Sequence, residues 1–146
     1  VLGPPRDRIL LESENDRSVV VRLVHGDVSF LLTGDLEEAG EEALVLPGPV
    51  TVMKAPHHGS RTSSSPALLE RARPRFAVFC VGKKNRFGFP HDEIVGRYEA
   101  LGARCLRTDL DGAITFRSDG RDVTVETFRP EGEVWRSARR GPASRD

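Results

Sequence analysis

Short runs in which apolar and β-branched residues alternate with polar ones predict strands near both ends of the chain. In the first of them, SVVVRLV is followed by the turn residues His25-Gly26-Asp27 and then by VSFLLT, and this pattern predicts a β-hairpin over residues 19–33. The next segment, residues 36–45, begins with acidic residues and has apolar residues three and four positions apart, so it predicts a helix. The expected apolar face of that helix consists of Leu36, Ala39, Ala43 and Leu44.

Strand and helix patterns then alternate along the rest of the chain. The expected strands are residues 50–55, 75–82, 103–108, 113–118 and 122–128, and the expected helices are residues 65–72, with Ser65 as the N-cap, and 91–102, which Gly102 ends. This order predicts an α/β fold: a layered β-sheet with helices, and antiparallel hairpins at both ends. In such sheets ligands bind beyond the carboxyl ends of the strands, where Asp35, His57, His58 and the loop 85–91 are expected.

Composition places the chain among globular domains and gives it no overall electrostatic preference. Its 146 residues, 38% of them hydrophobic, suit one domain, expected over residues 1–129, with 130–146 as a flexible basic tail. Lys and Arg number 22, as do Asp and Glu, so any anion site has to be local. No apolar run approaches the ~20 residues that span a bilayer, so the domain is expected to be soluble. The first residue is Val1 rather than Met, which suggests a fragment of a longer chain.

Two cysteines lie in apolar, strand-like runs. This setting indicates that Cys80 and Cys105 are buried thiols that behave as small hydrophobic residues. A disulfide between them stays open at this stage, because it requires that the two strands be neighbours.

One aspartate and two histidines at the expected strand ends have the chemistry of a metal site. Carboxylate and neutral imidazole suit Zn²⁺ or Mn²⁺, and a carboxylate such as that of Asp35 can bridge two metals about 3.5–4 Å apart in phosphodiester-cleaving sites. Side chains of adjacent residues on an extended segment point in opposite directions. One of His57 and His58 is therefore expected to be a metal ligand, and the other to contact phosphate or to orient the ligating histidine. Structural alternatives are a helix cap for Asp35 and His91 and a turn for Asn85.

Five stretches, in order along the chain, carry a family resemblance: NDRSVVVRL, SFLLTGDLE, APHHGSRTSSSPALLE, VGKKNRFGFPHDEIV and RTDLDGAITF. Together, over residues 12–120, they resemble the metallo-β-lactamase-fold domain at the C-terminal end of ComEC-type competence proteins. The resemblance implies an αββα sandwich of two similar halves with metal ions between them, and an activity like that of the metal-dependent phosphodiesterases and nucleases of this superfamily. ComEC-type proteins form the inner-membrane channel for single-stranded DNA in natural transformation, and their domain is proposed to degrade the strand that is not imported.

The resemblance also implies roles for individual residues. Asp35 would be the bridging metal ligand and His58 the ligand of the second metal, while His57 would be a further ligand or a phosphate contact. His91 would be another ligand or the proton donor to the leaving oxygen, and Asn85 would face the same pocket.

The HxHxDH-type metal motif of the superfamily is absent from this chain. The resemblance therefore implies half of the sandwich, its C-terminal half, inactive alone, with the divalent metal (Zn or Mn) belonging to the intact domain. The implied partners are the missing N-terminal half, the membrane channel of the parent chain and single-stranded DNA. The parent protein would lie in the bacterial inner membrane with this domain on the outer face. The face that would meet the missing half is expected to be apolar. Without that half, a homodimer is the alternative way to cover this face.

Two other functions are compatible with the same residues. A non-catalytic DNA-handling module would hold phosphate through backbone amides and the side chains of Ser60, Thr62 and Ser63. Its basic rim would consist of Lys54, Arg61, Lys83, Lys84 and Arg86. Salt-dependent binding of single-stranded DNA without metal favours this function. A hydrolase of another phosphodiester, such as one of the cell wall, would keep the metal site and change the substrate.

Overall fold

The computed structural model describes residues 1–4, 13–128 and 134–136. In these residues five strands form a mixed sheet in the order β1-β2-β3-β4-β5. The strands are β1 (Val21–His25), β2 (Val28–Leu32), β3 (Val52–Lys54), β4 (Phe76–Phe79) and β5 (Arg104–Arg107). β1 and β2 pair antiparallel as a hairpin, and every later pairing in this sheet is parallel. The predicted α/β class is therefore confirmed, because parallel neighbours joined by helices are what the alternating pattern predicted.

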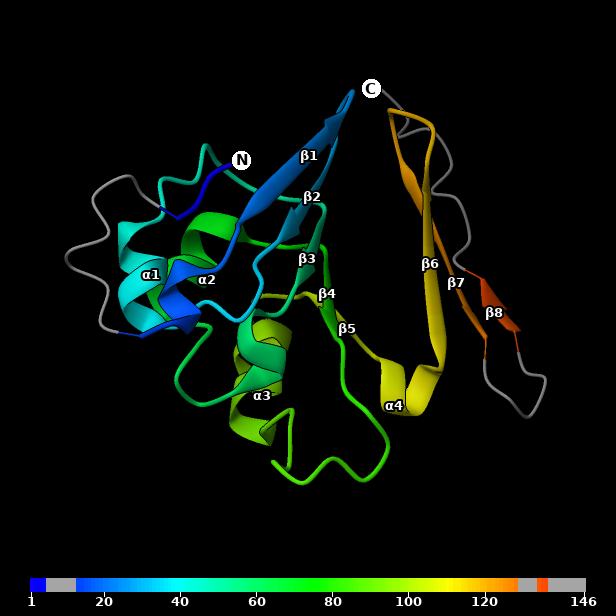
Figure 1. Cartoon of the computed structure of the whole chain (residues 1–146). Coiled ribbons are helices and arrows are strands. Elements are labelled where there is room, and N and C mark those ends of the chain that lie inside the picture. Colours follow the sequence, from blue (N-terminus) through cyan, green and yellow to red (C-terminus); the bar gives the residue numbers. More distant parts are fainter. Residues whose placement is uncertain (5–12, 129–133, 137–146) are drawn as a thin grey trace.

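Helices and a second sheet cover the two faces of this sheet. Helices lie on one face, and a three-stranded antiparallel sheet lies on the other (Figure 1). The helices are α1 (Glu38–Ala43), α2 (Pro66–Ala72) and α3 (Asp92–Ala100), and the second sheet consists of β6 (Ala113–Ser118), β7 (Val123–Phe128) and β8 (Val134–Arg136). A short helix, α4 (Thr108–Asp111), joins the two sheets. Of the expected tail, 134–136 forms β8, which pairs with β7, and the rest lies outside the described residues.

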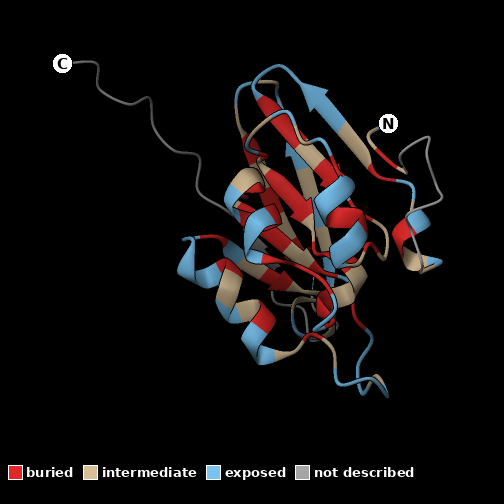
Figure 2. Ribbon diagram, turned by 90° about the vertical axis from the view of Figure 1, so that its left-hand side faces the viewer, coloured by how far each residue is buried: buried red, intermediate tan, exposed pale blue. Residues whose placement is uncertain are grey.

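Apolar side chains fill both interlayer spaces. Figure 2 shows that buried residues are concentrated on the strands of the sheet and on the sides of the helices that face it. Leu31, Met53 and Phe79 point from the strands into the helical layer, where the buried Tyr98 ring meets Phe79 edge to face. On the opposite face Phe116 of the second sheet packs against Phe30 and Phe76. Burial on both faces explains why the sequence of β4 reads as a nearly continuous apolar run.

Helix α1 is shorter than predicted, and its expected apolar face is confirmed only in part: Leu36 and Leu44, just outside the helix, are buried. Ala39 and Ala43 are exposed, whereas Gly40 and Glu41 are buried. Glu41 is turned inward by hydrogen bonds: its two carboxylate oxygens accept from the backbone N–H groups of Ser64 and Ser65, just before α2. The apolar periodicity alone could not predict a helix that turns a carboxylate inward.

The prediction of two buried thiols was wrong for Cys80. Cys80 lies one residue beyond the end of β4 and is exposed, while Cys105 is half-buried on β5. Both cysteines are free, so the open question of a disulfide is answered. Burial raises the pKa of the Cys105 thiol to about 11.

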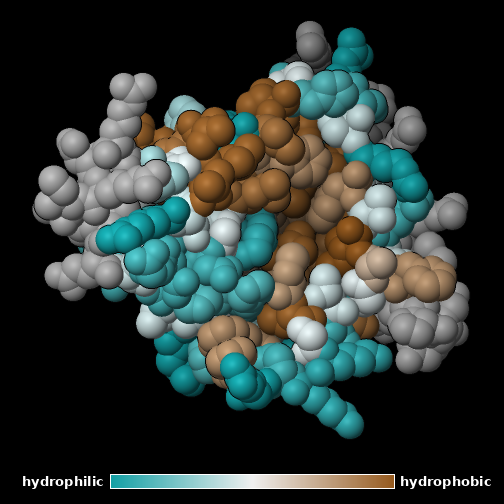
Figure 3. All heavy atoms as spheres, in the orientation of Figure 1, coloured by the Kyte–Doolittle hydropathy of each residue, from teal (hydrophilic) through white to brown (hydrophobic). Residues whose placement is uncertain are grey.

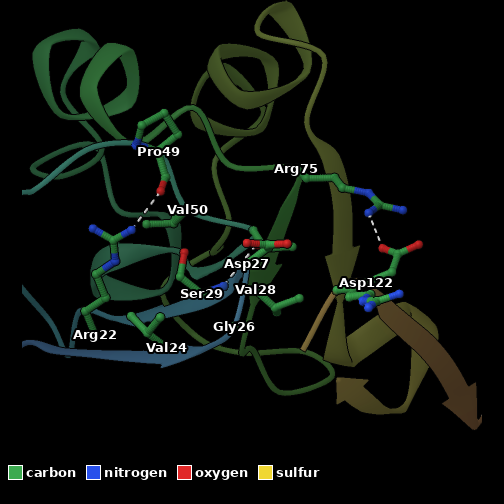
Figure 4. A pocket seen from close by; sticks show the side chains of 12 residues that line it. Arg22, Val24, Gly26, Asp27, Val28, Ser29, Pro49, Val50, Arg75 and Asp122 are labelled. Carbon is green, nitrogen blue, oxygen red and sulfur yellow. Dashed lines mark hydrogen bonds and ion pairs between the residues drawn. The ribbon is translucent and has the colours of Figure 1, made fainter. Parts of the chain in front are cut away.

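Polar contacts tie the two sheets together at the amino ends of the parallel strands. The carboxylate of Asp122 lies 2.6 Å from the Arg75 guanidinium, and the N–H of Asp27 donates to the carbonyl of Gly120 at 2.7 Å (Figure 4). These contacts border a polar cavity of about 360 Å³, into which Arg22 and Arg121 also face. The Pro49 carbonyl accepts from Arg22 and the Asp122 carboxylate from Arg75, so the polar groups of this cavity are used in part within the junction between the sheets.

Apolar side chains remain uncovered over the first hairpin. Figure 3 shows them gathered over β1 and β2 and continuing toward β6. Leu23 and Leu32 are exposed on the hairpin and lie on the same face of it, the face on which Phe30 packs against the second sheet. Contiguous apolar surface of this kind is uncommon on a monomer.

Candidate metal and phosphate site

A cavity of about 540 Å³ opens beyond the carboxyl ends of β2, β3 and β4. It is lined by Asp35, His57, His58, Cys80, Gly82, Asn85, Phe87 and Phe89. Three strand ends therefore deliver the polar side chains of one site, as expected from the α/β topology.

The histidine pair lies on a tight bend, contrary to the extended segment that the sequence suggested. Residues Pro56–Gly59 form a 3₁₀ turn in which His57 and His58 have φ angles of 43° and 56°. This left-handed region is uncommon for residues other than glycine, and its cost is met where surrounding contacts fix the backbone. Here the Ser63 hydroxyl donates to the Pro56 carbonyl, and the Ser60 N–H donates to the His57 carbonyl. Because of the bend, both imidazoles reach the same cavity, with ring centroids 6.5 Å apart.

His58 is oriented as a metal-ligating histidine is. Its Nδ1 lies 2.6 Å from the Cys80 carbonyl, which can only accept, so Nδ1 carries the proton. In the neutral ring Nε2 then presents a lone pair, 3.3 Å from Oδ1 of Asp35. Two facing acceptors repel unless a proton or a cation lies between them. A backbone carbonyl behind the second nitrogen is a common way to fix the tautomer of a ligating histidine.

His57 has a carboxylate behind it. Its Nδ1 lies 3.1 Å from Oε1 of Glu37, which also accepts a 2.8 Å hydrogen bond from the Thr62 hydroxyl. Burial would raise the pKa of Glu37, but hydrogen bonds from Thr62, Ser13 and Asn15 and the charge of His57 outweigh it and hold the pKa below 4.5. Glu37 is therefore ionised at neutral pH and keeps the Nδ1 proton of His57, so that Nε2 is the free nitrogen.

Asp35 does not cap a helix. Glu37 occupies the N-cap position of α1, and the backbone N–H of Asp35 donates to the Ser18 hydroxyl. The carboxylate instead faces His58 on one side and Lys54 on the other, whose ammonium nitrogen lies 3.5 Å from the same Oδ1.

The other residues predicted for the site differ in their access to the cavity. Asn85 lines it, and its side chain holds the loop through hydrogen bonds with Phe89. Ser60 and Ser63 are buried in the turn, and the Ser60 hydroxyl meets that of Thr62 at 3.0 Å. Because these hydroxyls contact the turn or Glu37, the phosphate role proposed for them stays a prediction.

His91 lies beside the cavity rather than among its lining residues. It precedes α3, makes no side-chain cap, and its ring meets the edge of Phe89. Its Nε2 is 3.5 Å from Arg61, which also pairs with Glu93 at 3.2 Å. Its predicted catalytic role is untested.

Four side chains at the site had no role in the sequence-based prediction: those of Glu37, Cys80, Phe87 and Phe89. The one usable signal was the spacing of Glu37, two residues after Asp35 and at the edge of the same strand end. Cys80 contributes through its carbonyl, which no side-chain pattern reveals.

The side chains at this cavity provide part of the ligand set that a metal ion requires. Two ligand atoms about 2.0–2.1 Å from a tetrahedral Zn²⁺ lie about 3.3 Å apart, which is the separation found between Oδ1 of Asp35 and Nε2 of His58. Within the described part of the chain, however, no three or more His, Cys, Asp and Glu side chains are grouped to hold a metal. Catalytic zinc sites usually have three protein ligands, so this pair is a fraction of a complete set.

Gly59 fixes the turn that carries the histidines, and its replacement is expected to be costly. Its φ is 87°, and a Cβ there would lie 2.6 Å from Cβ of Pro90 and 2.9 Å from a ring carbon of Phe79. We expect Gly59→Ala to lower the free energy of unfolding by about 2 kcal/mol or more in urea titrations, from strain and overpacking together. The control, Gly96→Ala on the exposed side of α3, has no atom within 4 Å of the new Cβ and is expected to add about 0.5–1 kcal/mol. Equal stabilities of Gly59→Ala and wild type would contradict this account of the turn.

The five-stranded mixed sheet with its helices is consistent with part of a metallo-β-lactamase fold. Residues 2–83, more than half of the chain, match the family model of the metallo-beta-lactamase superfamily. The chain belongs to this superfamily.

Among curated proteins the chain is similar to competence proteins. It is 34% identical over 121 residues to ComE operon protein 3 of Bacillus subtilis (strain 168), covering 81% of this chain and 16% of that protein. It is 38% identical over 128 residues to Competence protein ComA of Neisseria gonorrhoeae, covering 84% of this chain and 18% of that protein. Recombination protein 2 of Haemophilus influenzae is 32% identical over 136 residues, with 92% and 17% covered.

The chain thus spans under a fifth of the length of these relatives. It is a metallo-β-lactamase domain segment related to competence proteins of the ComEC and ComA type. In the part of it that the structure describes, no helix is both long and apolar enough to cross a membrane.

Proposed function

We propose that the cavity is one side of a divalent-metal site, Zn²⁺ or Mn²⁺, that hydrolyses phosphodiester bonds of single-stranded DNA in a competence protein. The observation that carries the proposal is the position of His58, whose protonated Nδ1 is held by a carbonyl while Nε2 faces the Asp35 carboxylate at 3.3 Å. An imidazole lone pair and a carboxylate oxygen set at that separation suit a cation and repel each other without one.

Each side chain then has a definite task. A bound divalent ion would supply Lewis-acid stabilisation and an activated water. Asp35 and His58 would hold it, and Glu37 would keep the proton on Nδ1 of His57, so that Nε2 of His57 faces the cavity as a ligand or phosphate contact. Phe87 and Phe89 line the apolar side, where a nucleobase could stack, since their rings are parallel to within 20° at 5.5 Å.

The remaining ligands would come from outside this chain's described residues. We propose the N-terminal half of the same domain as their source, docked on the exposed apolar surface of Leu23 and Leu32. A second copy of the chain is the alternative cover. The inner-membrane channel of a longer parent protein would then bring the DNA strand to the site, with the domain on the outer face.

A second function, DNA handling without hydrolysis, is favoured by one observation: the described residues provide only a two-ligand pair. In that case salt-dependent binding of single-stranded DNA would persist in a chelator.

Cleavage of a labelled single-stranded oligonucleotide by the full natural protein that contains this segment tests the proposal. With Mn²⁺ or Zn²⁺ we expect hydrolysis that a chelator stops and that Asp35→Asn lowers at least about a hundredfold, since a ligand to the metal is lost. Asp27→Asn, at the opposite end of the sheet, is the matched control and should cleave as wild type does. Cleavage unchanged by Asp35→Asn would refute the proposal, and metal-independent binding without cleavage would favour the DNA-handling function.

A further inference from the structure

Lys54 brings a positive charge into the site that a metal-binding function does not require. It is the last residue of β3, and its side chain is only 20% exposed. Its ammonium donates to the carbonyl of Gly34 at 2.6 Å and to that of Ala55 at 3.3 Å, and it lies 3.5 Å from Oδ1 of Asp35. The three ammonium protons therefore have three acceptors, all at the ends of β2 and β3.

With a metal ion bound between Asp35 and His58, one carboxylate oxygen would face two cations, the ion and the Lys54 ammonium. Oδ1 of Asp35 faces the Lys54 ammonium at 3.5 Å and Nε2 of His58 at 3.3 Å. A metal ion held by Asp35 and His58 would lie within a few ångströms of the ammonium, about where Coulomb repulsion between unit charges still amounts to several kcal/mol at an effective dielectric constant of ~20. Burial lowers the pKa of Lys54, with Asp35 acting against it, which agrees with a desolvated ammonium held by its carboxylate.

Two backbone contacts keep the ammonium from leaving. An exposed lysine could swing into water when an ion arrives, but Lys54 would lose the hydrogen bonds to Gly34 and Ala55 by doing so. The Gly34 carbonyl would still accept from the N–H of His57, but Lys54 would give up both of its backbone acceptors. The charge is therefore fixed beside Asp35 whether or not an ion is bound.

We propose that Lys54 is a resident cation that neutralises Asp35 and competes with the divalent ion for it, so that it sets the affinity of the site. Lys54 is a positioning residue: it acts through Asp35, and its donors are used within the protein. The inference rests on the proposed metal site. Lys54 would lower the affinity of that site for the divalent ion, so that the ion stays exchangeable until the other ligands and the phosphate are in place.

Calorimetric titration of the chain with Mn²⁺ and Zn²⁺ tests this inference through the direction of the change. Lys54→Met keeps the length and apolar stem and removes the charge, and we expect it to bind the ion at least about tenfold more tightly than wild type, equivalent to about 1.4 kcal/mol. Lys54→Arg, which keeps the charge, should bind within about threefold of wild type. Lys83→Met, an exposed lysine of the neighbouring loop, controls for the loss of one net charge and should change the affinity little.

The outcomes separate this inference from the proposed function. A merely structural role for Lys54 predicts weaker binding by Lys54→Met, because a disordered site loses ligands, so tighter binding supports competition and nothing else. If wild type binds and Lys54→Met binds equally or more weakly, the inference fails and the metal site stands. If only Lys54→Met binds, the inference holds in its strongest form. If no variant binds either ion while circular dichroism shows all of them folded, the metal site of this chain fails, and the inference with it.

Discussion

His58→Ala is expected to weaken the binding of Zn²⁺ and Mn²⁺ by about a hundredfold or more. Disturbing a group behind a ligating histidine already costs 10–100-fold in metal affinity, and this substitution removes the ligand itself. It also leaves the Cys80 carbonyl without the Nδ1 proton that it accepts at 2.6 Å. Isothermal titration of wild type and variant under the same conditions measures the effect.

His25→Ala is the control for this substitution. His25 ends β1 at the opposite edge of the sheet, where its Nδ1 meets the Ser118 hydroxyl at 3.1 Å. Any nonspecific binding of metal to surface imidazoles would fall similarly in both variants. Equal affinities of His58→Ala and His25→Ala would therefore show that the ion does not bind at Asp35 and His58.

Glu41→Ala is expected to be the most destabilising single substitution in the helical layer, by about 3 kcal/mol or more. The side chain is fully buried, and its two oxygens accept the backbone N–H groups of Ser64 and Ser65. Removing it leaves two buried donors unsatisfied, at about 1–3 kcal/mol each, and a cavity besides. Chemical denaturation at pH 7 measures the loss, and Glu42→Ala, one residue away and exposed, should stay within about 0.5 kcal/mol of wild type. Similar losses for both would contradict the role assigned to Glu41.

The same carboxyl group makes a prediction about pH. Burial raises the pKa of Glu41 above 4.5, although the hydrogen bonds from Ser65 and Ser64 act against it. An acid whose pKa is higher in the folded state stabilises the fold fully below its unfolded value of 4.5 and loses that contribution as pH rises through the folded value. Wild type should therefore lose this share of its stability above pH 4.5, while Glu41→Ala should lack that part of the slope.

The elements of the fold followed from local patterns, and their surroundings did not. Ser65 caps α2 as expected, its hydroxyl accepting from the N–H of Leu68, because cap chemistry is local to four residues. The inward face of α1 depends on a partner 23 residues further along the chain, the N–H of Ser64, and apolar spacing carries no information about it. Cys80 was assigned to the strand because its neighbours are apolar, but β4 ends at Phe79.

The sequence was sufficient to predict which strand ends form the candidate site, but not how its side chains are oriented. Parallel topology brings Asp35, His57 and His58 to one edge, and their sequence positions were sufficient to expect this. The bend at the histidines was not, because an extended backbone was the ordinary choice for residues without glycine's freedom. The partners that fix their tautomers, Glu37 and the Cys80 carbonyl, became visible only in three dimensions. Lys54 was predicted to belong to a basic rim around the pocket, yet its side chain is largely buried and its ammonium donates to backbone carbonyls.

The most direct test of the central claim is the position of the ion itself. A crystal of the chain grown at saturating Mn²⁺ would give an anomalous difference map in which the ion is located independently of the protein model. The account predicts a peak bonded to both Oδ1 of Asp35 and Nε2 of His58, with Nδ1 of His58 still within hydrogen-bond distance of the Cys80 carbonyl to which it donates. An ion bound elsewhere, with Nε2 of His58 in direct hydrogen bond to Asp35 at saturation, would contradict it.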